Sequence, residues 1–373
     1  MLPLDTVSAR PRPRYSPGMP LQRTPLADAD RSALLRDVVA ALRNGQLCVL
    51  PTETVYGIAA LPTHESAGAR ARRWRGLNED HPLTLHLADA DDVDALDVRL
   101  HRGAERLMER YWPGPLTMIV GNRSGEETLG LRVPSHPFTR ELIRAIGEPL
   151  WLTSVAQTGA APLTEPDAIE AACHTDISML VDDGASPLGA ASTVVRADGA
   201  ELEVLREGIL SREEVLHTAA DVVLFVCTGN TCRSPLAEHF ARRATARAMG
   251  VSEDRVLARG LRFASAGTAT GFGMGASEGS VEAGAEAGLD LSAHASQPLD
   301  MDLCDRAVKI YCLSDSHRRA LTAQAPDAAD RIELLRPDGA DIADPYGGDL
   351  QVYREARDEI ASAVQERAGD WWP

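Results

Sequence analysis

Short apolar runs alternate with longer amphipathic segments through the C-terminal part of the chain. Val222–Val226 is a continuous run rich in β-branched residues, which predicts a strand buried on both faces of a parallel sheet. Two further strands are predicted at ARGLRFASAG and RAVKIYCL, and helices at ASEGSVEAGAEAGL and DLQVYREARDEIASAVQ, where Val352, Ile360 and Val364 lie near helical spacing. This alternation predicts a doubly wound parallel α/β sheet with its site at the C-terminal ends of the strands.

The chain of 373 residues is long enough for two domains with separate cores. The polar stretch SREEVLHTAA, residues 211–220, predicts a helical linker, so we expect one domain over residues 27–210 and another over residues 221–373. Residues 1–26 are rich in proline and predict a flexible extension. They lack the apolar centre of a signal peptide.

The amino-acid composition argues against a membrane protein, a strong nucleic-acid binder and a disulfide scaffold. Hydrophobic residues make up 44% of the chain, and no apolar run approaches membrane-spanning length, so we expect no membrane partner. The net charge of −17 argues against strong sequence-independent binding to nucleic acid. Six cysteines suit a reducing cytoplasm better than a disulfide scaffold, and we therefore expect a cytoplasmic protein.

A strand, a tight loop and a helix start follow one another in DVVLFVCTGNTCRSPL, and the loop holds Cys227 and Arg233. Ser234 before Pro235 predicts the helix start, with Ser234 as its N-cap. The backbone N–H groups of such a loop converge with the helix N-terminus on an anion site, and Arg233 adds a planar fork for two phosphate oxygens. The same positive field favours the thiolate form of Cys227, which is the nucleophilic form.

The loop VCTGNTCRSP resembles the catalytic loop of low-molecular-weight protein tyrosine phosphatases, and FASAGTATG, GLDLSAHASQPL and DIADPYGGD continue the resemblance. The resemblance implies that Cys227 attacks phosphorus, that Arg233 holds the phosphoryl group and that Asp344 is the general acid. It implies phosphorylated proteins as substrates, with no metal and no cofactor. Residues that bind phosphate or set selectivity are then Thr228, Gly229, Asn230, Thr231, Cys232, Ser234 and Tyr346. Either Ser234 donates a hydrogen bond to the thiolate and Asn230 braces the loop, or helix capping and turn formation alone explain these two residues.

Thr231 bears on the choice of substrate. Family members that act on phosphotyrosine usually carry Ile at this position, and those that act on phosphoarginine carry Thr. The sequence DPYGGD also looks like the arginine-phosphatase branch, although Phe is more familiar where Tyr346 stands. The resemblance therefore favours phosphoarginine over phosphotyrosine. The alternative is that Thr231 is a loop residue with no effect on selectivity.

Three other cysteines leave alternatives open. Cys232 either captures an oxidised Cys227 as a disulfide or is a small packed thiol beneath the loop. Cys312 lies where arsenate reductases of this fold begin a disulfide relay, but Arg319 stands seven residues on and Cys304 precedes Cys312. A thiol-dependent arsenate reductase is therefore an alternative whose relay looks incomplete.

Residues 27–210 resemble the YrdC family, whose founding activity is the synthesis of threonylcarbamoyl-AMP from threonine, bicarbonate and ATP. The matching pieces are LCVLPTETVYGIAA, HPLTLHL, YWPGPLTMIV, LRVPSHP, ASTVV and LREGIL. The resemblance implies a twisted mixed α/β sheet with a concave, positively lined cleft. It also implies ATP, L-threonine and bicarbonate as substrates, together with Mg²⁺, and tRNA as an indirect partner through the threonylcarbamoyladenosine pathway.

Carried over residue by residue, the YrdC site is only partly kept. Threonine contacts fall on Thr54, His86, Arg132 and Ser192, and nucleotide contacts fall on Arg75, Ser154 and Arg206. The family's Lys-x-Arg pair aligns with Arg75–Gly76–Leu77, and its Ser-Ala-Asn motif is Ser154–Val155–Ala156 here. We expect the nearby Arg72 and Arg73 to face elsewhere. Since the loss of a charged contact weakens transition-state stabilisation, synthase activity is expected to be weak or lost. A module that only binds a small ligand is the alternative.

Overall fold

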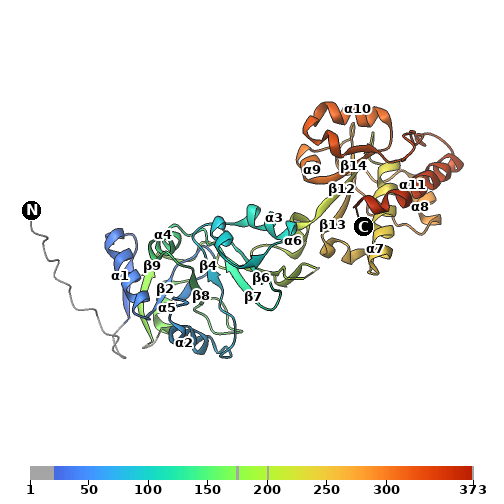
Figure 1. The fold of residues 1–373 in the computed structure, drawn as a ribbon. Helices are drawn as coiled ribbons and strands as arrows, with labels where there is room; N and C mark the ends of the chain where they lie inside the picture. Colours follow the sequence, from blue (N-terminus) through green and yellow to red (C-terminus); the bar gives the residue numbers. More distant parts are fainter. Residues whose placement is uncertain (1–20, 174–175, 200, 372–373) are drawn as a thin grey trace, which may run out of the picture. The chain divides into compact units, whose positions relative to one another are not determined.

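The computed structural model describes residues 21–173, 176–199 and 201–371 (Figure 1). The chain divides into two compact units, Met1–Val215 and Leu216–Pro373. The division falls inside helix α6 (Arg212–Ala219), which occupies the polar stretch predicted as a helical linker. Residues 1–20 of the proline-rich extension lie outside the described residues. In the described ranges, no helix is both long and apolar enough to cross a bilayer.

The N-terminal unit is built on one mixed sheet of parallel and antiparallel pairs, as expected. Its strands run in the order β1-β9-β2-β3-β8-β4-β7-β6-β10-β11, and β5 pairs with β6. Their bounds are β1 Gln22–Pro25, β2 Leu47–Leu50, β3 Gly57–Ala60, β4 Leu85–His86, β5 Val98–Arg99, β6 Leu116–Asn122, β7 Thr128–Arg132, β8 Leu150–Ser154, β9 Ile177–Asp182, β10 Thr193–Arg196 and β11 Glu203–Arg206.

Strand β1 corrects the expectation that all of residues 1–26 form a flexible extension. Gln22 lies opposite Met179 and Pro25 opposite Asp182 in a parallel pair with β9. Arg23 fixes this pair, because its guanidinium lies 2.8 Å from the carboxylate of Asp182. A proline is tolerated here because β1 is an edge strand, where a backbone donor can be missing. A strand of four residues is too short to show a periodicity in the sequence.

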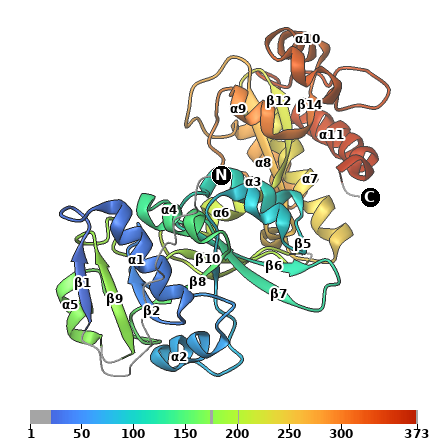
Figure 2. The same ribbon diagram turned by 60° about the vertical axis from the view of Figure 1, so that its left-hand side comes forward.

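Helices cover both faces of the N-terminal sheet. Strand β2 alternates, with Cys48 and Leu50 packed in one core and Leu47 and Val49 in the other. Helices α1 (Arg31–Arg43) and α4 (Pro137–Ile146) contribute to the first core, and α2 (Glu65–Arg75) and α5 (Pro166–Ala172) to the second. Helix α3 (Arg102–Tyr111) packs against β6. Figure 2 shows α1 and α2 beside different parts of this sheet.

The C-terminal unit is the predicted doubly wound parallel sheet. Its strand order is β13-β12-β14-β15, with β12 Asp221–Cys227, β13 Leu261–Gly267, β14 Ala307–Cys312 and β15 Ile332–Leu334. All three neighbouring pairs are parallel. The helices are α7 Arg233–Met249, α8 Glu278–Glu286, α9 Met301–Arg306, α10 Asp315–Gln324 and α11 Leu350–Trp371.

The central strand β12 is buried on both faces, as its apolar run predicted. Val223 and Phe225 pack with residues of α7 and α11, whereas Val222, Leu224 and Val226 pack with residues of α9 and α10. In α11, Ile360 and Val364 are buried as their spacing predicted, but Val352 is exposed. Val352 lies in the first turn of α11, where it packs outside these two cores. The parallel order brings the end of β12 to the centre of one sheet edge, where the predicted loop begins.

Replacing Phe225 by alanine tests the energetic weight of this core. The ring is fully buried and lies 5.9 Å from the Tyr311 ring and 6.4 Å from the Trp371 ring. Phe225→Ala should lower the free energy of unfolding of the C-terminal unit by about 3–5 kcal/mol. Phe272→Ala is the control, since Phe272 is 82% exposed, and should change it by less than about 0.5 kcal/mol. Hydrogen exchange of peptides from residues 216–371 in urea measures the free energy of unfolding of both variants. Equal losses in Phe225→Ala and Phe272→Ala would contradict the packing described.

Candidate functional sites

The loop between β12 and α7 holds the predicted anion site. Strand β12 ends at Cys227 and α7 begins at Arg233, with Cys232 at the N-cap position. The prediction that Ser234 caps this helix is therefore wrong, since Ser234 lies inside the first turn. The hydroxyl of Ser234 lies 3.0 Å from Cys227 Sγ instead of bonding to the helix backbone. The side chain of Cys232, at the N-cap position, makes no capping hydrogen bond to this helix.

Cys227 is buried and surrounded by hydrogen-bond donors. The backbone N–H of Asn230 donates to Cys227 Sγ over 3.2 Å. The side-chain amide of Asn230 donates to Ser234 Oγ over 3.0 Å, which leaves the hydroxyl proton of Ser234 available to the sulfur. Two hydrogen-bond donors are thus directed at one sulfur atom. The structure therefore brings Cys227, Asn230 and Ser234 together.

The backbone conformation and the contacts of Asn230 determine the shape of the loop. Its φ of 52° is positive, a conformation that asparagine tolerates better than most side chains. Its side-chain oxygen accepts the backbone N–H of Gln297 over 2.9 Å, and its carbonyl accepts from His294 Nε2 over 2.6 Å. Gly267 leaves room for the loop, because a Cβ there would lie 2.6 Å from the Thr228 carbonyl. These contacts hold the conformation of the loop.

Arg233 and Asp344 meet although they are far apart in sequence. The guanidinium of Arg233 donates to the Asp344 carboxylate over 2.6 Å and to the Ile342 carbonyl over 2.9 Å. The Arg233 side chain is 6% exposed, and that of Asp344 is 48% exposed. The Nε–H of Arg233 has no partner among the described residues. The Asp344 carboxylate also accepts the backbone N–H of Tyr346, whose side chain is 78% exposed.

The remaining loop residues face different surroundings. Cys232 donates its S–H to Ser277 Oγ over 3.2 Å and is buried. The hydroxyl of Thr231 lies 3.6 Å from Cys232 Sγ. The backbone carbonyl of Thr231 accepts a hydrogen bond from the backbone N–H of Ser277. Gly229 lies between the exposed Thr228 and the buried Asn230. All six cysteines of the chain are free thiols.

The surroundings of Cys304 and Cys312 argue against the arsenate reductase alternative. Cys312 lies at the end of β14 and is fully buried. Burial raises the pKa of the Cys312 thiol to about 12 and that of Cys304 to about 11. A relay needs thiols that ionise readily, so these two cysteines are core residues. Arg319, at the second relay position, pairs with Asp315 on the helix surface.

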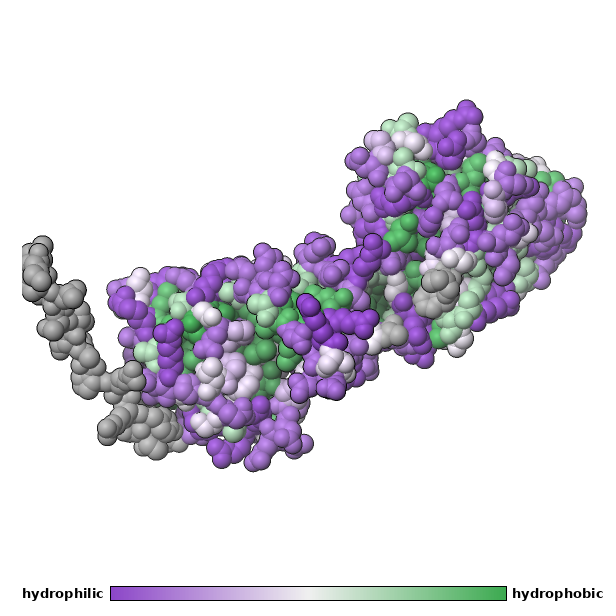
Figure 3. Space-filling model, viewed as in Figure 1, coloured by the Kyte–Doolittle hydropathy of each residue, from purple (hydrophilic) through white to green (hydrophobic). Residues whose placement is uncertain are grey.

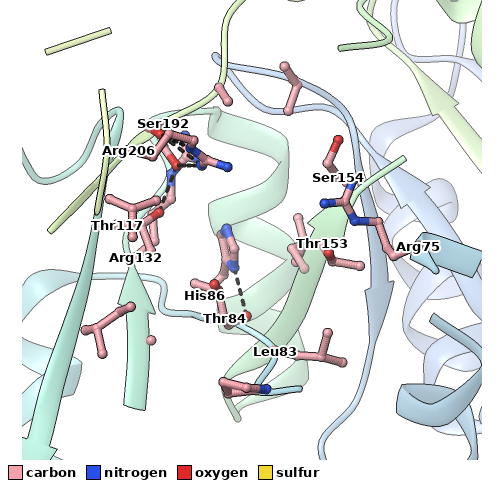
Figure 4. Close-up of a pocket in the computed structure, with 18 of the residues that line it drawn as sticks. Arg75, Leu83, Thr84, His86, Thr117, Arg132, Thr153, Ser154, Ser192 and Arg206 are labelled. Atoms are coloured by element: carbon pink, nitrogen blue, oxygen red, sulfur yellow. Dashed lines mark hydrogen bonds between the residues drawn. The ribbon is translucent and has the colours of Figure 1, made fainter. Parts of the chain in front are cut away.

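A cavity of about 450 Å³ opens in the N-terminal unit, and most of the predicted YrdC site residues line it. Figure 4 shows Arg75 and Ser154 on one side, Ser192, Arg206 and Arg132 on the other, and His86 between them. Around this part of the unit, apolar residues appear within a mainly polar surface (Figure 3). The described residues contain no group of three or more His, Cys, Asp and Glu side chains that could hold a metal ion.

Thr54 is placed behind the cavity wall. It is fully buried, and its hydroxyl accepts a hydrogen bond from the guanidinium of Arg132 over 2.8 Å. The same guanidinium contacts Glu53 over 2.5 Å, and the Glu53 carboxylate accepts the backbone N–H of Ser135. Sequence reasoning missed Glu53; a carboxylate within the apolar stretch LCVLPTETVYGIAA was the available signal. The Glu53 carboxylate pairs with the Arg132 guanidinium and offsets part of its charge.

Arg75 and Arg206 are the uncompensated charges of the cavity. Arg75 donates to the Ala156 carbonyl and Arg206 to the Ser192 carbonyl over 2.9 Å. Within the described ranges, neither guanidinium pairs with a carboxylate. Burial lowers the pKa of Arg75, as does the charge of Arg206; burial likewise lowers the pKa of Arg206, as does the charge of Arg132. An anionic ligand would relieve both effects.

His86 is a neutral group at the floor of the cavity. Burial, together with the charge of Arg132, lowers its pKa to about 3. Its Nδ1–H donates to the Thr84 carbonyl over 3.2 Å, so Nε2 carries no proton and can accept a hydrogen bond. This suits a ligand group with an N–H or O–H, such as an ammonium.

The two departures from the YrdC motifs also lie at the cavity. Leu77 lines it, and Ala156 contacts two of the lining residues through its backbone, since its carbonyl accepts from Arg75 and its N–H donates to the Ser154 hydroxyl. Arg72 faces elsewhere, as expected, because it contacts Glu65 and the His81 carbonyl and lies over the Trp151 ring. The described structure therefore provides no second guanidinium at position 77 and no carboxamide at position 156.

Comparisons with known proteins match the same two segments. Residues 40–208 match the family model described as telomere recombination, which includes the YrdC proteins, and residues 222–368 match that of low molecular weight phosphotyrosine protein phosphatase. A threonylcarbamoyl-AMP synthase of Bacillus subtilis is 30% identical over 190 residues, 48% of this chain and 55% of the relative. This chain therefore spans little more than half the length of that relative.

Two other relatives are covered almost completely. A threonylcarbamoyl-AMP synthase of Chromohalobacter salexigens is 33% identical over 165 residues, 42% of this chain and 86% of the relative. A protein-arginine-phosphatase of Geobacillus stearothermophilus is 36% identical over 154 residues, 39% of this chain and 93% of the relative. Each half of the chain thus resembles a separate protein.

The anion loop predicts a stabilising effect of inorganic phosphate. Phosphate should raise the unfolding temperature of the C-terminal unit, since an anion bound at 100 times its Kd adds about 2.7 kcal/mol of stability. Arg233→Lys should remove most of this increase, because lysine lacks the fork that holds two oxygens. Arg336→Lys is the control, since Arg336 pairs with Asp338 on the surface. Thermal unfolding with and without phosphate measures the effect; an equal increase in both variants would place the anion elsewhere.

Proposed function

The chain belongs to the YrdC family through residues 40–208 and to the low molecular weight phosphotyrosine protein phosphatase family through residues 222–368, and we propose that it is a cysteine-dependent protein phosphatase joined to a small-molecule-binding domain. The observation that carries the phosphatase proposal is the preformed loop. Cys227 Sγ lies 3.0 Å from Ser234 Oγ, and Arg233 with Asp344 lies at the same loop. We propose the domain bounds 27–210 and 221–373 for these two parts.

In the proposed reaction, Cys227 attacks phosphorus in line and the bond to the leaving group breaks. The loop N–H groups and Arg233 hold the phosphoryl oxygens, so positioning and charge stabilisation supply most of the rate. Asp344 gives its proton to the leaving group and then takes one from the water that hydrolyses the cysteinyl-phosphate. Thr228, Gly229, Thr231 and Cys232 complete the loop, and Tyr346 lines its entrance. No step of this reaction uses a metal.

We favour phosphoarginine over phosphotyrosine as the substrate. Thr231 supports this choice, because its hydroxyl and small volume suit a polar guanidinium better than Ile does. The Geobacillus stearothermophilus relative named protein-arginine-phosphatase supports it as well. The proposed partners are therefore proteins phosphorylated on arginine.

For the N-terminal domain, we propose threonine binding with slow or absent adenylate formation. His86, Arg132 and Ser192, with Thr54 behind Arg132, offer the groups to bind an amino acid, and Arg75, Ser154 and Arg206 those to bind a nucleotide phosphate. ATP with Mg²⁺ and bicarbonate would be the co-substrates. Leu77 cannot neutralise a phosphate, and the side chain of Ala156 cannot hydrogen-bond one. These two residues favour a binding module over an efficient synthase, and tRNA would be involved only indirectly.

The nucleophile and the acid can be tested separately. Cys227→Ser should abolish hydrolysis of aryl phosphates, because serine in this loop is a far weaker nucleophile. Asp344→Asn should slow kcat by about 10²–10⁴-fold for substrates with poor leaving groups, and less for nitrophenyl phosphate, which needs little proton donation. Steady-state kinetics on both substrate classes measures this. Full activity of the serine variant would place the nucleophile elsewhere.

Substrate choice should follow position 231. Thr231→Ile should shift the ratio of kcat/KM for phosphoarginine over phosphotyrosine by at least about tenfold toward phosphotyrosine. Thr231→Val is the control, since it removes the hydroxyl at nearly constant volume and so separates polarity from bulk. Steady-state kinetics on peptides that carry phosphoarginine or phosphotyrosine measures this ratio in each variant. A ratio unchanged in both variants would mean that Thr231 is not a selectivity filter.

Restoring the missing contacts should restore synthesis. In the double variant Leu77→Arg and Ala156→Asn, pyrophosphate release from ATP, threonine and bicarbonate should rise by about tenfold or more, because a charge-assisted bond contributes about 1.5–3 kcal/mol. Leu77→Met with Ala156→Ser is the control, since it adds no charge. Threonine binding is followed by calorimetry. Robust synthesis by the unmodified protein would refute the proposal, and no gain with threonine still bound would leave a binding module.

A further inference from the structure

His317 contacts the anion loop but belongs to none of the predicted motifs. It lies in the first turn of α10 and is 5% exposed. Both ring nitrogens have partners: Nε2 lies 2.8 Å from Thr228 Oγ1, and Nδ1 lies 2.8 Å from Ser314 Oγ. Thr228 directly follows Cys227 in the chain. The ring thus links the residue beside the thiol to the start of a helix.

The ring is held in its neutral form. Burial, together with the charge of Arg233, lowers the pKa of His317 to about 4, and the carboxylates of Asp344 and Asp341 only partly oppose this. A neutral imidazole has one N–H and one lone pair, so it donates to one hydroxyl and accepts from the other. The hydroxyls of Thr228 and Ser314 can satisfy either tautomer, which makes the bridge stable at neutral pH.

Thr228 needs this support because packing does not provide it. Its side chain is exposed, and its backbone is held on one side, where its carbonyl accepts the N–H of Ala269 over 3.0 Å. The other end of the loop is fixed by Asn230 through His294 and Gln297. The bond from His317 fixes the first residue of the loop, so the loop amides are anchored at both ends.

We propose that His317 is a positioning residue of the phosphatase reaction, which acts by holding Thr228 and thereby the first N–H groups of the anion loop. This inference rests on the proposed phosphatase function. The amides must point to the equatorial oxygens of the transition state, and a displacement of about 1 Å can cost up to about 100-fold in rate. Loss of the bridge should therefore lower kcat more than it changes KM.

Two substitutions separate the two ring nitrogens. The amide of His317→Gln reaches the place of Nε2 and can keep the bond to Thr228, whereas that of His317→Asn reaches only the place of Nδ1, beside Ser314. On an aryl phosphate, His317→Asn should lower kcat by about tenfold with KM changed by less than about twofold. His317→Gln should retain kcat within about threefold. A residue that only packs under the loop would give similar losses in both variants, and that result would overturn the proposal.

A double-mutant cycle tests whether Thr228 carries the effect. Thr228→Val removes the same bond from the exposed side at constant shape and should reproduce the tenfold loss in kcat. In the Thr228→Val protein, His317→Asn should cause no further loss, because the bond is already absent. Full additivity of the two losses would overturn the proposal. If His317→Asn does not fold, Thr228→Val alone decides, and unchanged kcat in that variant would overturn the proposal.

Binding of inorganic phosphate separates this inference from the proposed function. The Kd for orthovanadate, whose five-coordinate adduct with a thiolate resembles the transition state, should rise by about tenfold in His317→Asn and Thr228→Val but not in His317→Gln, whereas the Kd for phosphate should change by less than about twofold; calorimetry on the full chain measures both. If the unmodified protein binds phosphate without hydrolysing phosphoesters, the proposed function fails and these Kd values still test the role of His317. If the unmodified protein neither binds phosphate nor hydrolyses phosphoesters, both proposals are wrong.

Discussion

A buried guanidinium must have a negative partner or an acceptor nearby, and both sites of this protein are organised around that requirement. Arg233 is 6% exposed beside the thiol loop and contacts the Asp344 carboxylate. Arg132 is equally buried in the N-terminal unit and contacts Glu53. Arg75 donates to a carbonyl oxygen, and Arg206 donates to the carbonyl and hydroxyl oxygens of Ser192; burial and like charge lower the pKa of each. Arg233 and Arg132 thus each have a carboxylate partner within the protein, whereas Arg75 and Arg206 have none among the described residues.

The anion loop between β12 and α7, called the thiol loop here because it holds Cys227, needs several supporting contacts to direct its N–H groups to one point. Asn230 holds a positive φ, and its side chain joins Ser234 to Gln297. These bonds fix the direction of the loop N–H groups through contacts within the protein. Such a site depends on residues that never touch the substrate, and His294 is one of them. The cost of changing them should appear in rate more than in affinity.

In the N-terminal cavity, the fold of the family is present while two side chains depart from its motifs. The strands that carry His86, Arg132 and Ser154 are paired as the sheet requires, and their side chains face the cavity. Leu77 and Ala156 lie outside these strands, so their departures from the motifs do not disturb the sheet. Function resides in a few side chains on a fold that tolerates their replacement, so family membership alone does not fix the activity.

The sequence by itself determined the two folds, three of the four strands of the C-terminal sheet and the residues of the thiol loop. It could do so because the apolar run of β12 is short, continuous and rich in β-branched residues and because the loop residues are contiguous. Only the tertiary structure decided that Glu53 pairs with Arg132, that Gln22–Pro25 form an edge strand, that Ser234 faces the thiol and that His317 reaches Thr228. These outcomes depend on residues as many as 159 positions apart, as with Arg23 and Asp182. No local pattern encodes such contacts, because they form only when packing brings separate elements to one place.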